Sequence, residues 1–338
     1  MTRTTVAVAL GSGGARGYAH IGVLQVLAEH DYEIVAIAGS SMGALIAGLH
    51  AAGRLDQYTS WVQGLNQLDV MRLMDVSLSA PGVIHAAKIL DKVREILGEV
   101  QIEDLPIPFT AVATDLTSGR PKWFQKGPVD TAIRASIAIP GVITPYVHNG
   151  RVLVDGGILD PVPIAPLAAA GADLIIGVDL GADTGGIDSE VGETPTQVVP
   201  GAIEAIRQAA SPILDRDFVR SIVDRFAGDP GANDADTVDA EADSSARRHP
   251  ETESRVITSP TDDSAVRKLS RFTVMDRSLD IMQEALARYQ LAAFPPDLLI
   301  EVPRTAIRSL DFHRAGEMID LGRTLTERAL DDLQTRRW

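Results

Sequence analysis

A serine lies between two glycines in the pentapeptide Gly39-Ser40-Ser41-Met42-Gly43, which has the G-x-S-x-G spacing of a nucleophile turn. Glycine at both ends lets the backbone turn sharply and leaves room beside the central serine. If a helix begins here, its first N–H groups favour negative charge that develops on the Ser41 side chain. An ordinary strand-to-helix turn with a serine N-cap would use the same residue types. The pattern makes Ser41 a candidate catalytic nucleophile.

A second glycine-rich segment, residues 11–17, contains Gly13, Gly14, Ala15 and Arg16. A glycine-rich turn at the end of a strand lets backbone N–H groups point at an anion. One interpretation is an oxyanion hole, in which the amides of Gly13, Gly14 and Ala15 face the Ser41 turn. Adjacent parallel strands bring both turns to the same edge of a sheet, which favours this interpretation.

A nucleotide site is the competing interpretation of residues 11–17. A dinucleotide loop would have its third glycine where Arg16 stands. It would also have an acidic residue at the end of the second strand, which here ends in Gly39-Ser40. A P-loop needs a Gly-Lys-Ser/Thr sequence, and the nearest lysine is Lys88. Nucleotide binding is therefore the weaker interpretation.

A nucleophilic serine needs a base, and histidine is the usual one. Only His148 and His313 fall in expected loops; the other histidines are His20, His30, His50, His85 and His249. Asp155 is the stronger candidate, because it follows an apolar run and precedes two glycines that allow close backbone approach. A carboxylate at the end of a buried strand can have a raised pKa and accept a proton directly. An aspartate in a plain Asp-Gly turn is the alternative.

Strands and helices alternate along the chain, and they must position these turns. The expected strands are residues 4–10, 33–38, 108–115, 151–154, 173–179 and 297–302, and the expected helices are residues 18–29, 44–52, 129–137, 275–291 and 314–333. Residues 54–100 are expected to be mostly helical. The order strand, turn, helix predicts an α/β fold with a parallel sheet and helical crossovers, which the C-terminal strand completes.

The composition narrows the functional classes. The chain has 338 residues and a formal net charge of −15, which argues against a nucleic-acid partner, because phosphate binding needs clustered Lys and Arg. The same charge disfavours adhesion to anionic lipid. Without cysteine there are no disulfides, thiolate nucleophiles or cysteine zinc sites. No stretch reaches the roughly 20 apolar residues of a membrane span and none is typical of a secretory signal, so we expect a cytoplasmic protein with at most transient, peripheral membrane contact.

Residues 183–268 differ in character from the rest of the chain. They are polar, acidic and short of core residues, and the run 228–243 contains Asp and Glu but no Lys or Arg. We expect a largely disordered insertion, with amphipathic helices within residues 197–226. The catalytic domain would then consist of residues 1–182 and 269–338.

The sequences GGARG (residues 13–17), GSSMG (39–43) and DGG (155–157) occur in this order, together with ATD (113–115) and the stretches 134–141 and 311–316. Each motif alone is weak, but the ordered set is specific. In this combination the chain resembles the patatin-like phospholipases, in particular the bacterial single-domain branch related to the catalytic domain of neuropathy target esterase. The resemblance covers about residues 1–182 and 270–325.

The resemblance implies a three-layer α/β/α fold with a mainly parallel central sheet, and a Ser–Asp dyad without histidine. Ser41 would attack a lipid acyl ester, Asp155 would take its proton, and the amides of the glycine-rich loop would hold the oxyanion. Arg16 would brace that loop, and no metal or organic cofactor is implied. The chain departs from the family at Asp160, where asparagine is usual. A carboxylate there is expected to raise the pKa of Asp155 or to alter its hydrogen bonds.

Two alternatives stay open. An α/β-hydrolase esterase would combine Ser41 with an aspartate and either His148 or His313, although its nucleophile turn usually comes later in the chain. A regulatory, acyl-lipid-binding protein would keep the fold without turnover, and the intact Ser41 and Asp155 argue against it. In the hydrolase interpretation, the acyl chain is expected to contact apolar helices within residues 58–90.

Overall fold

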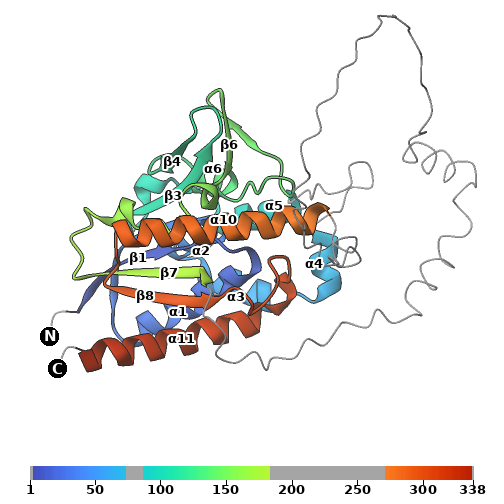
Figure 1. Ribbon diagram of the computed structural model, residues 1–338. Coiled ribbons are helices and arrows are strands. Elements are labelled where there is room, and N and C mark those ends of the chain that lie inside the picture. The colour runs from blue at the N-terminus through green and yellow to red at the C-terminus, as the bar shows by residue number, and fades with distance from the viewer. Residues whose placement is uncertain (1–2, 74–86, 183–270, 337–338) are drawn as a thin grey trace, which may run out of the picture. The chain divides into compact units, whose positions relative to one another are not determined.

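The computed structural model describes residues 3–73, 87–182 and 271–336 (Figure 1). All of these residues belong to one unit of the chain, made of Met1–Gly185 and Asp262–Trp338. The acidic run 228–243 and the helices expected within residues 197–226 lie outside the described residues. The division of the chain at residues 183 and 268 therefore stays a prediction.

A mostly parallel sheet of eight strands runs through the unit, in the order β5-β6-β3-β2-β1-β7-β8, with β4 paired to β3. Strands β3, β2, β1, β7 and β8 are parallel, whereas β4, β5 and β6 add antiparallel pairs at one side. The strands are β1 (Thr5–Leu10), β2 (Glu33–Ser40), β3 (Phe109–Asp115), β4 (Arg120–Phe124), β5 (Tyr146–His148), β6 (Arg151–Asp155), β7 (Leu174–Ala182) and β8 (Leu298–Pro303).

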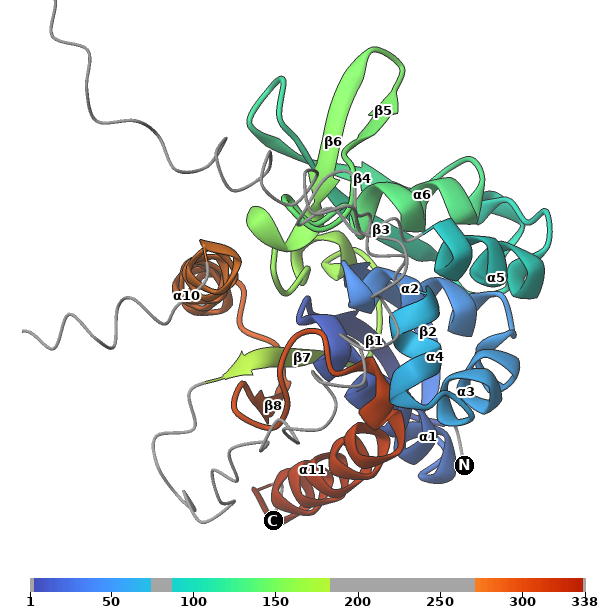
Figure 2. The same cartoon turned by 90° about the vertical axis from the view of Figure 1, so that its right-hand side faces the viewer.

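Helices cover both faces of the sheet. They are α1 (Ala19–Glu29), α2 (Met42–Ala51), α3 (Leu55–Gln63), α4 (Gln67–Leu73), α5 (Ala87–Leu97), α6 (Val129–Ser136), α10 (Arg271–Ala293) and α11 (Ala315–Arg336). The larger core joins one sheet face to α1, α2, α3, α5, α6 and α11, whereas α10 packs on the other face. Figure 2 shows α10 end-on, with β7 and β8 between it and α11. No helix within the described ranges is both long and apolar enough to cross a membrane.

The two sheet faces differ in side-chain size, as β1 illustrates. Val6, Val8 and Leu10 point into the larger core, whereas Ala7 and Ala9 point toward α10. Successive side chains of a strand alternate between faces, so this sequence builds one thick and one thin layer. The small alanines let the segment after β6 and helix α10 approach the sheet closely.

The predicted α/β fold with a central, mainly parallel sheet is confirmed, and β8 pairs with β7 as expected of the C-terminal strand. Two details differ. Strand β2 runs to Ser40 and α2 begins at Met42, so the nucleophile turn is tighter than predicted. Strands β4 and β5 were not predicted. The sequence pattern misses them because β4 contains Pro121 and is mostly exposed, and because β5 has only three residues.

Candidate active site

Ser41 is the single residue between β2 and α2, and its backbone has the unusual angles φ 55° and ψ −123°. A positive φ strains a non-glycine residue, so the surroundings must impose it. A Cβ on Gly39 would overlap the backbone of Gly43, and a Cβ on Gly43 would overlap the carbonyl of Leu10. Both glycines are therefore needed for the close packing that holds Ser41 in this conformation.

Strand β3 brings Asp155 to Ser41. Val112 of β3 pairs with Ser40, the last residue of β2, and the next residue, Ala113, pairs with Asp155, the last residue of β6. Where β2 ends, β6 therefore pairs with the continuation of β3. Because β3 pairs with β2 in parallel and with β6 in antiparallel register, Ser41 and Asp155 lie at the same point of the sheet.

Ser41 Oγ donates a hydrogen bond to Asp155 Oδ2 at 2.5 Å, and Asp155 Oδ1 accepts one from the Gly157 N–H at 2.8 Å. Both side chains are buried, with residue exposures of 3% for Ser41 and 1% for Asp155. Burial raises the pKa of Asp155 to about 6, although its two hydrogen bonds act in the opposite direction. The carboxylate can therefore exchange a proton near neutral pH.

The glycine-rich segment opens a short 3₁₀ helix, Gly14–Tyr18, beside Ser41. Gly13 and Gly14 line a cavity of about 50 Å³ together with Ser41 and Asp155, which we call the Ser41 cavity. Within the described part of the chain, the Gly13 and Gly14 amides have no hydrogen-bond partner, whereas the Ala15 N–H donates to Ser309 O at 2.9 Å. Of the three expected oxyanion donors, Gly13 and Gly14 are thus the ones left open.

Arg16 fastens the glycine-rich loop to two other elements. Its buried guanidinium donates to Gly13 O at 3.1 Å and to Arg304 O at 3.2 Å, and it pairs with Asp280 of α10 at 3.0 Å. A guanidinium can satisfy several acceptors at once in a fixed geometry. The contacts are of the kind expected from a residue that braces the loop.

Ser136, the last residue of α6, was not singled out by sequence reasoning as a site residue. Its hydroxyl accepts the Ser41 N–H at 2.9 Å and donates to Val112 O at 2.5 Å. It therefore ties the strained turn to β3. Only its place in the stretch 134–141 signalled it in the sequence, since the contact joins segments 95 positions apart.

No histidine in the described ranges hydrogen-bonds to Ser41 or Asp155. Instead of loops, His148 lies in strand β5 and His313 in the short 3₁₀ helix Phe312–Arg314. His20 is buried, its Nε2 lies 2.8 Å from Gly11 O, and burial lowers its pKa to about 4. The geometry around Ser41 therefore favours a carboxylate over a histidine partner.

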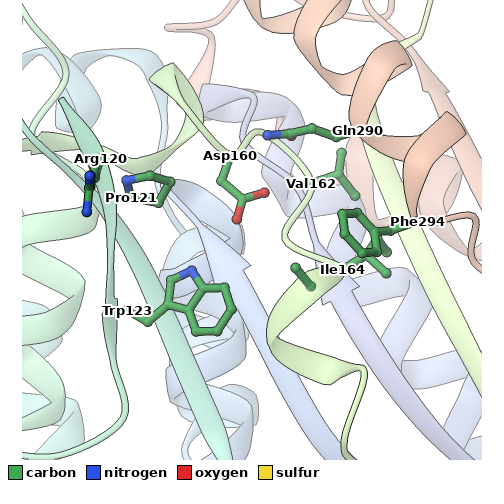
Figure 3. A pocket seen from close by; sticks show the side chains of 9 residues that line it. Arg120, Pro121, Trp123, Asp160, Val162, Ile164, Gln290 and Phe294 are labelled. Atoms are coloured by element: carbon green, nitrogen blue, oxygen red, sulfur yellow. The ribbon is translucent and has the colours of Figure 1, made fainter.

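One further expectation about the site needs correction. The Asp160 side chain lines a different cavity, and burial, not this second carboxylate, is the main cause of the raised pKa of Asp155 (Figure 3). Only its main chain reaches the nucleophile turn, where Asp160 O accepts the Ser40 hydroxyl at 2.5 Å. The expected acyl contacts within residues 58–90 stay a prediction: residues 74–86 lie outside the described residues, and the described ones do not line the Ser41 cavity, which Ile139, Val142 and α10 line.

In the part of the chain that the structure describes, no group of three or more His, Cys, Asp or Glu side chains could hold a metal ion.

Comparisons with known proteins agree with this architecture. The family described as patatin-like phospholipase matches residues 8–168. An uncharacterized NTE family protein of Mycobacterium tuberculosis is 50% identical over 332 residues, which cover 96% of this chain and 91% of the relative. The lysophospholipase NTE1 of Cryptococcus neoformans is 35% identical over 184 residues, or 52% of this chain and 11% of that protein. The patatin-like phospholipase domain-containing protein 7 of Mus musculus is 29% identical over 188 residues, or 54% and 14%. The chain belongs to the NTE family of patatin-like phospholipases.

Proposed function

We propose that the protein is a serine lipid acyl hydrolase, with Ser41 as nucleophile and Asp155 as its base. The observation that carries this proposal is the 2.5 Å hydrogen bond between Ser41 Oγ and Asp155 Oδ2 in a buried cavity. Membership of a lipid-hydrolase family, and a relative named as a lysophospholipase, support a lipid acyl ester as the substrate class.

In the first half of the reaction, Ser41 Oγ attacks the ester carbonyl while its proton moves to Asp155. A raised pKa suits the carboxylate to this task, because proton transfer is most effective when the pKa lies near the working pH. The Gly13 and Gly14 N–H groups are the candidate donors to the tetrahedral oxyanion. The carbon–oxygen bond to the alcohol then breaks, the alcohol takes the proton from Asp155, and the acyl group stays on Ser41.

In the second half, water replaces the alcohol. Asp155 takes a proton from the water as its oxygen bonds to the acyl carbon. The bond to Ser41 Oγ breaks, and Asp155 returns its proton to Ser41. The products are a carboxylic acid and the regenerated enzyme, and every proton passes through one carboxylate.

Two side chains act in this proposal as positioning residues. Arg16 holds the loop that supplies the oxyanion donors, and Ser136 holds the Ser41 N–H.

Helix α10 closes one side of the Ser41 cavity through Leu279 and Gln283. At about 50 Å³ the cavity is smaller than an acyl chain, so we expect α10 to shift when lipid binds.

We also propose that residues 1–182 and 269–338 together form the catalytic domain. The supporting observation is that β7 and β8 pair across the intervening segment, and that Arg16 bonds to α10.

A fluorophosphonate probe tests the nucleophile, because it labels activated serines. We expect the wild-type protein to be labelled and to hydrolyse short-chain esters, and Ser41→Ala to lose both. Loss of a catalytic serine lowers the rate by roughly 10⁴- to 10⁶-fold. The matched control is Ser40→Ala, whose hydroxyl donates to Asp160 O and which should keep most of its activity. Comparable activity in Ser41→Ala and wild type would refute the mechanism. A panel of phospholipid, lysophospholipid, monoacyl ester and thioester substrates would then define the head group.

A further inference from the structure

A second cavity, of about 360 Å³, lies apart from Ser41 on the sheet face that α10 covers. We call it the Asp160 cavity. Strand β4 contributes Arg120 and Trp123, the segment after β6 contributes Asp160 and Val162, and the end of α10 contributes Phe294. Figure 3 shows Asp160 between Arg120 on one side and Phe294 on the other, with the Trp123 ring across from it.

Asp160 is largely buried, and no described residue pairs with its carboxylate. The residue is only 7% exposed, and within the described ranges its carboxylate oxygens have neither a hydrogen-bond donor nor an ion-pair partner. A buried charge costs free energy unless a partner offsets it. Burial raises the pKa of Asp160 to about 6, so near pH 7.4 most molecules carry the charge. A cationic or hydrogen-bonding ligand would therefore stabilise the ionised carboxylate.

The walls of the cavity indicate which kind of cation fits. Trp123 and Phe294 present aromatic rings beside Asp160, and aromatic faces attract ammonium groups, including quaternary ones. Val162 adds apolar surface, which suits methyl groups. The described residues supply no further carboxylate or histidine to complete a metal site here. An organic ammonium group is therefore the better match.

Arg120 adds the opposite charge at the other side of the cavity. Its side chain is exposed, and it forms no ion pair with any residue that the structure describes. A guanidinium is well suited to bind phosphate. The cavity thus offers an anion next to aromatic rings, and Arg120 lies at its edge, three residues before Trp123 on β4.

We propose that the Asp160 cavity binds the zwitterionic head group of a phospholipid. The ammonium group would lie against Asp160 and the two aromatic rings, and the phosphate would lie at Arg120. The chain's net charge of −15 disfavours anionic bilayers and leaves zwitterionic lipid as the compatible surface. The site is separate from Ser41, so its occupation does not depend on the proposed chemistry.

Titration calorimetry with phosphocholine, the soluble head group alone, tests the proposal on the full chain. We expect saturable binding at millimolar concentration by wild type and equal binding by Ser41→Ala. Asp160→Asn keeps the shape but removes the charge, and should weaken binding about tenfold or more, as expected for loss of one charge-assisted contact. Phe294→Leu and Arg120→Met should each weaken it several-fold.

Matched controls are Tyr289→Leu, an exposed aromatic on α10 outside the cavity, and Asp332→Asn, an exposed carboxylate on α11. Both should bind phosphocholine as wild type does. Choline and inorganic phosphate should each bind more weakly than phosphocholine, and phosphatidylcholine vesicles should retain wild type more than Asp160→Asn. Failure of wild type to bind phosphocholine, or equal binding by wild type and Asp160→Asn, would overturn the proposal. Binding of phosphate but not choline would overturn the role of Asp160.

Discussion

Asp155 and Asp160 lie five positions apart on one segment, yet they face different cavities. Both are buried, and burial raises the pKa of each to about 6. Asp155 accepts hydrogen bonds from Ser41 and Gly157, whereas no described residue pairs with the Asp160 carboxylate. The two pKa values are therefore similar for different reasons. Asp155 is buried more deeply, but its hydrogen bonds partly offset the effect of burial, whereas the Asp160 carboxylate is less deeply buried and no described residue offsets the effect.

The comparison shows that a perturbed pKa does not by itself identify a catalytic group. What distinguishes the two carboxylates is the partner: a serine held in a strained turn in one case, and an open aromatic cavity in the other. Geometry therefore assigns proton transfer to Asp155 and ligand recognition to Asp160 in our proposals. The following experiments test that assignment.

The largest difference should appear when each carboxylate is replaced by its amide. We expect Asp155→Asn to lower kcat on a soluble short-chain ester by about 10³- to 10⁴-fold, because general base catalysis is removed. Asp160→Asn should stay within about tenfold of wild type, since its side chain is outside the Ser41 cavity. Equal losses in the two variants would contradict the assignment. A loss of kcat in His148→Ala or His313→Ala that exceeds the loss in Asp155→Asn would favour a histidine-based mechanism.

The two cavities also contain different arginines, which provide a second contrast. Arg16→Met should lower the rate about 100-fold, because a misplaced oxyanion donor costs about 3 kcal/mol of transition-state stabilisation. Arg120→Met should leave the rate on a soluble ester unchanged. Thermal unfolding must be measured alongside turnover. If the melting temperature of Arg16→Met falls steeply together with activity, the residue serves the fold and not the reaction.

The pH dependence of turnover should follow Asp155. The base must be ionised, so kcat/KM should fall about tenfold for each pH unit below the pKa of about 6 and level off above it. Asp160→Asn should have the same profile. A midpoint that moves substantially in Asp160→Asn would show that the two carboxylates titrate together, and would break the comparison.

The smallest effect concerns stability. The pKa of Asp160 in the folded protein, about 6, exceeds its ordinary value of 3.8, so its contribution to stability is present below about pH 4 and is lost as the pH rises through 6. Asparagine cannot ionise. Asp160→Asn should therefore be more stable than wild type at pH 8, by about 1–3 kcal/mol. Urea unfolding should show this gain shrinking at pH 5, and a variant that is less stable at both pH values would show that the carboxylate has a stabilising partner.

Much of the prediction of the fold and the candidate site rested on local sequence motifs. The G-x-S-x-G spacing identified the turn at Ser41, and the glycine-rich segment at residues 11–17 was expected beside it. Both rest on short-range physics, because glycine is needed wherever the backbone turns sharply or approaches another chain segment closely. Strand and helix patterns gave the fold class for the same reason, since periodicity is a local property.

Contacts between distant segments were decided only by the tertiary structure. Asp155 reaches Ser41 because β6 and β2 meet end to end along β3, a register that no local pattern encodes. Ser136 bonds to Ser41 across 95 positions. The Ala15 amide is taken by Ser309 in the same way.

Asp160 illustrates most clearly the difference between what the sequence determines and what the tertiary structure decides. From the sequence it is an acidic residue close to Asp155, and proximity in the chain suggested an electrostatic effect on its neighbour. In the structure the intervening backbone turns Asp160 into another cavity, where β4 and α10 supply its surroundings. The sequence by itself determined which residues can do chemistry and which turns must present them. Only the packing of segments far apart in the chain decided which cavity each side chain lines, because burial and hydrogen-bond partners are properties of the folded chain.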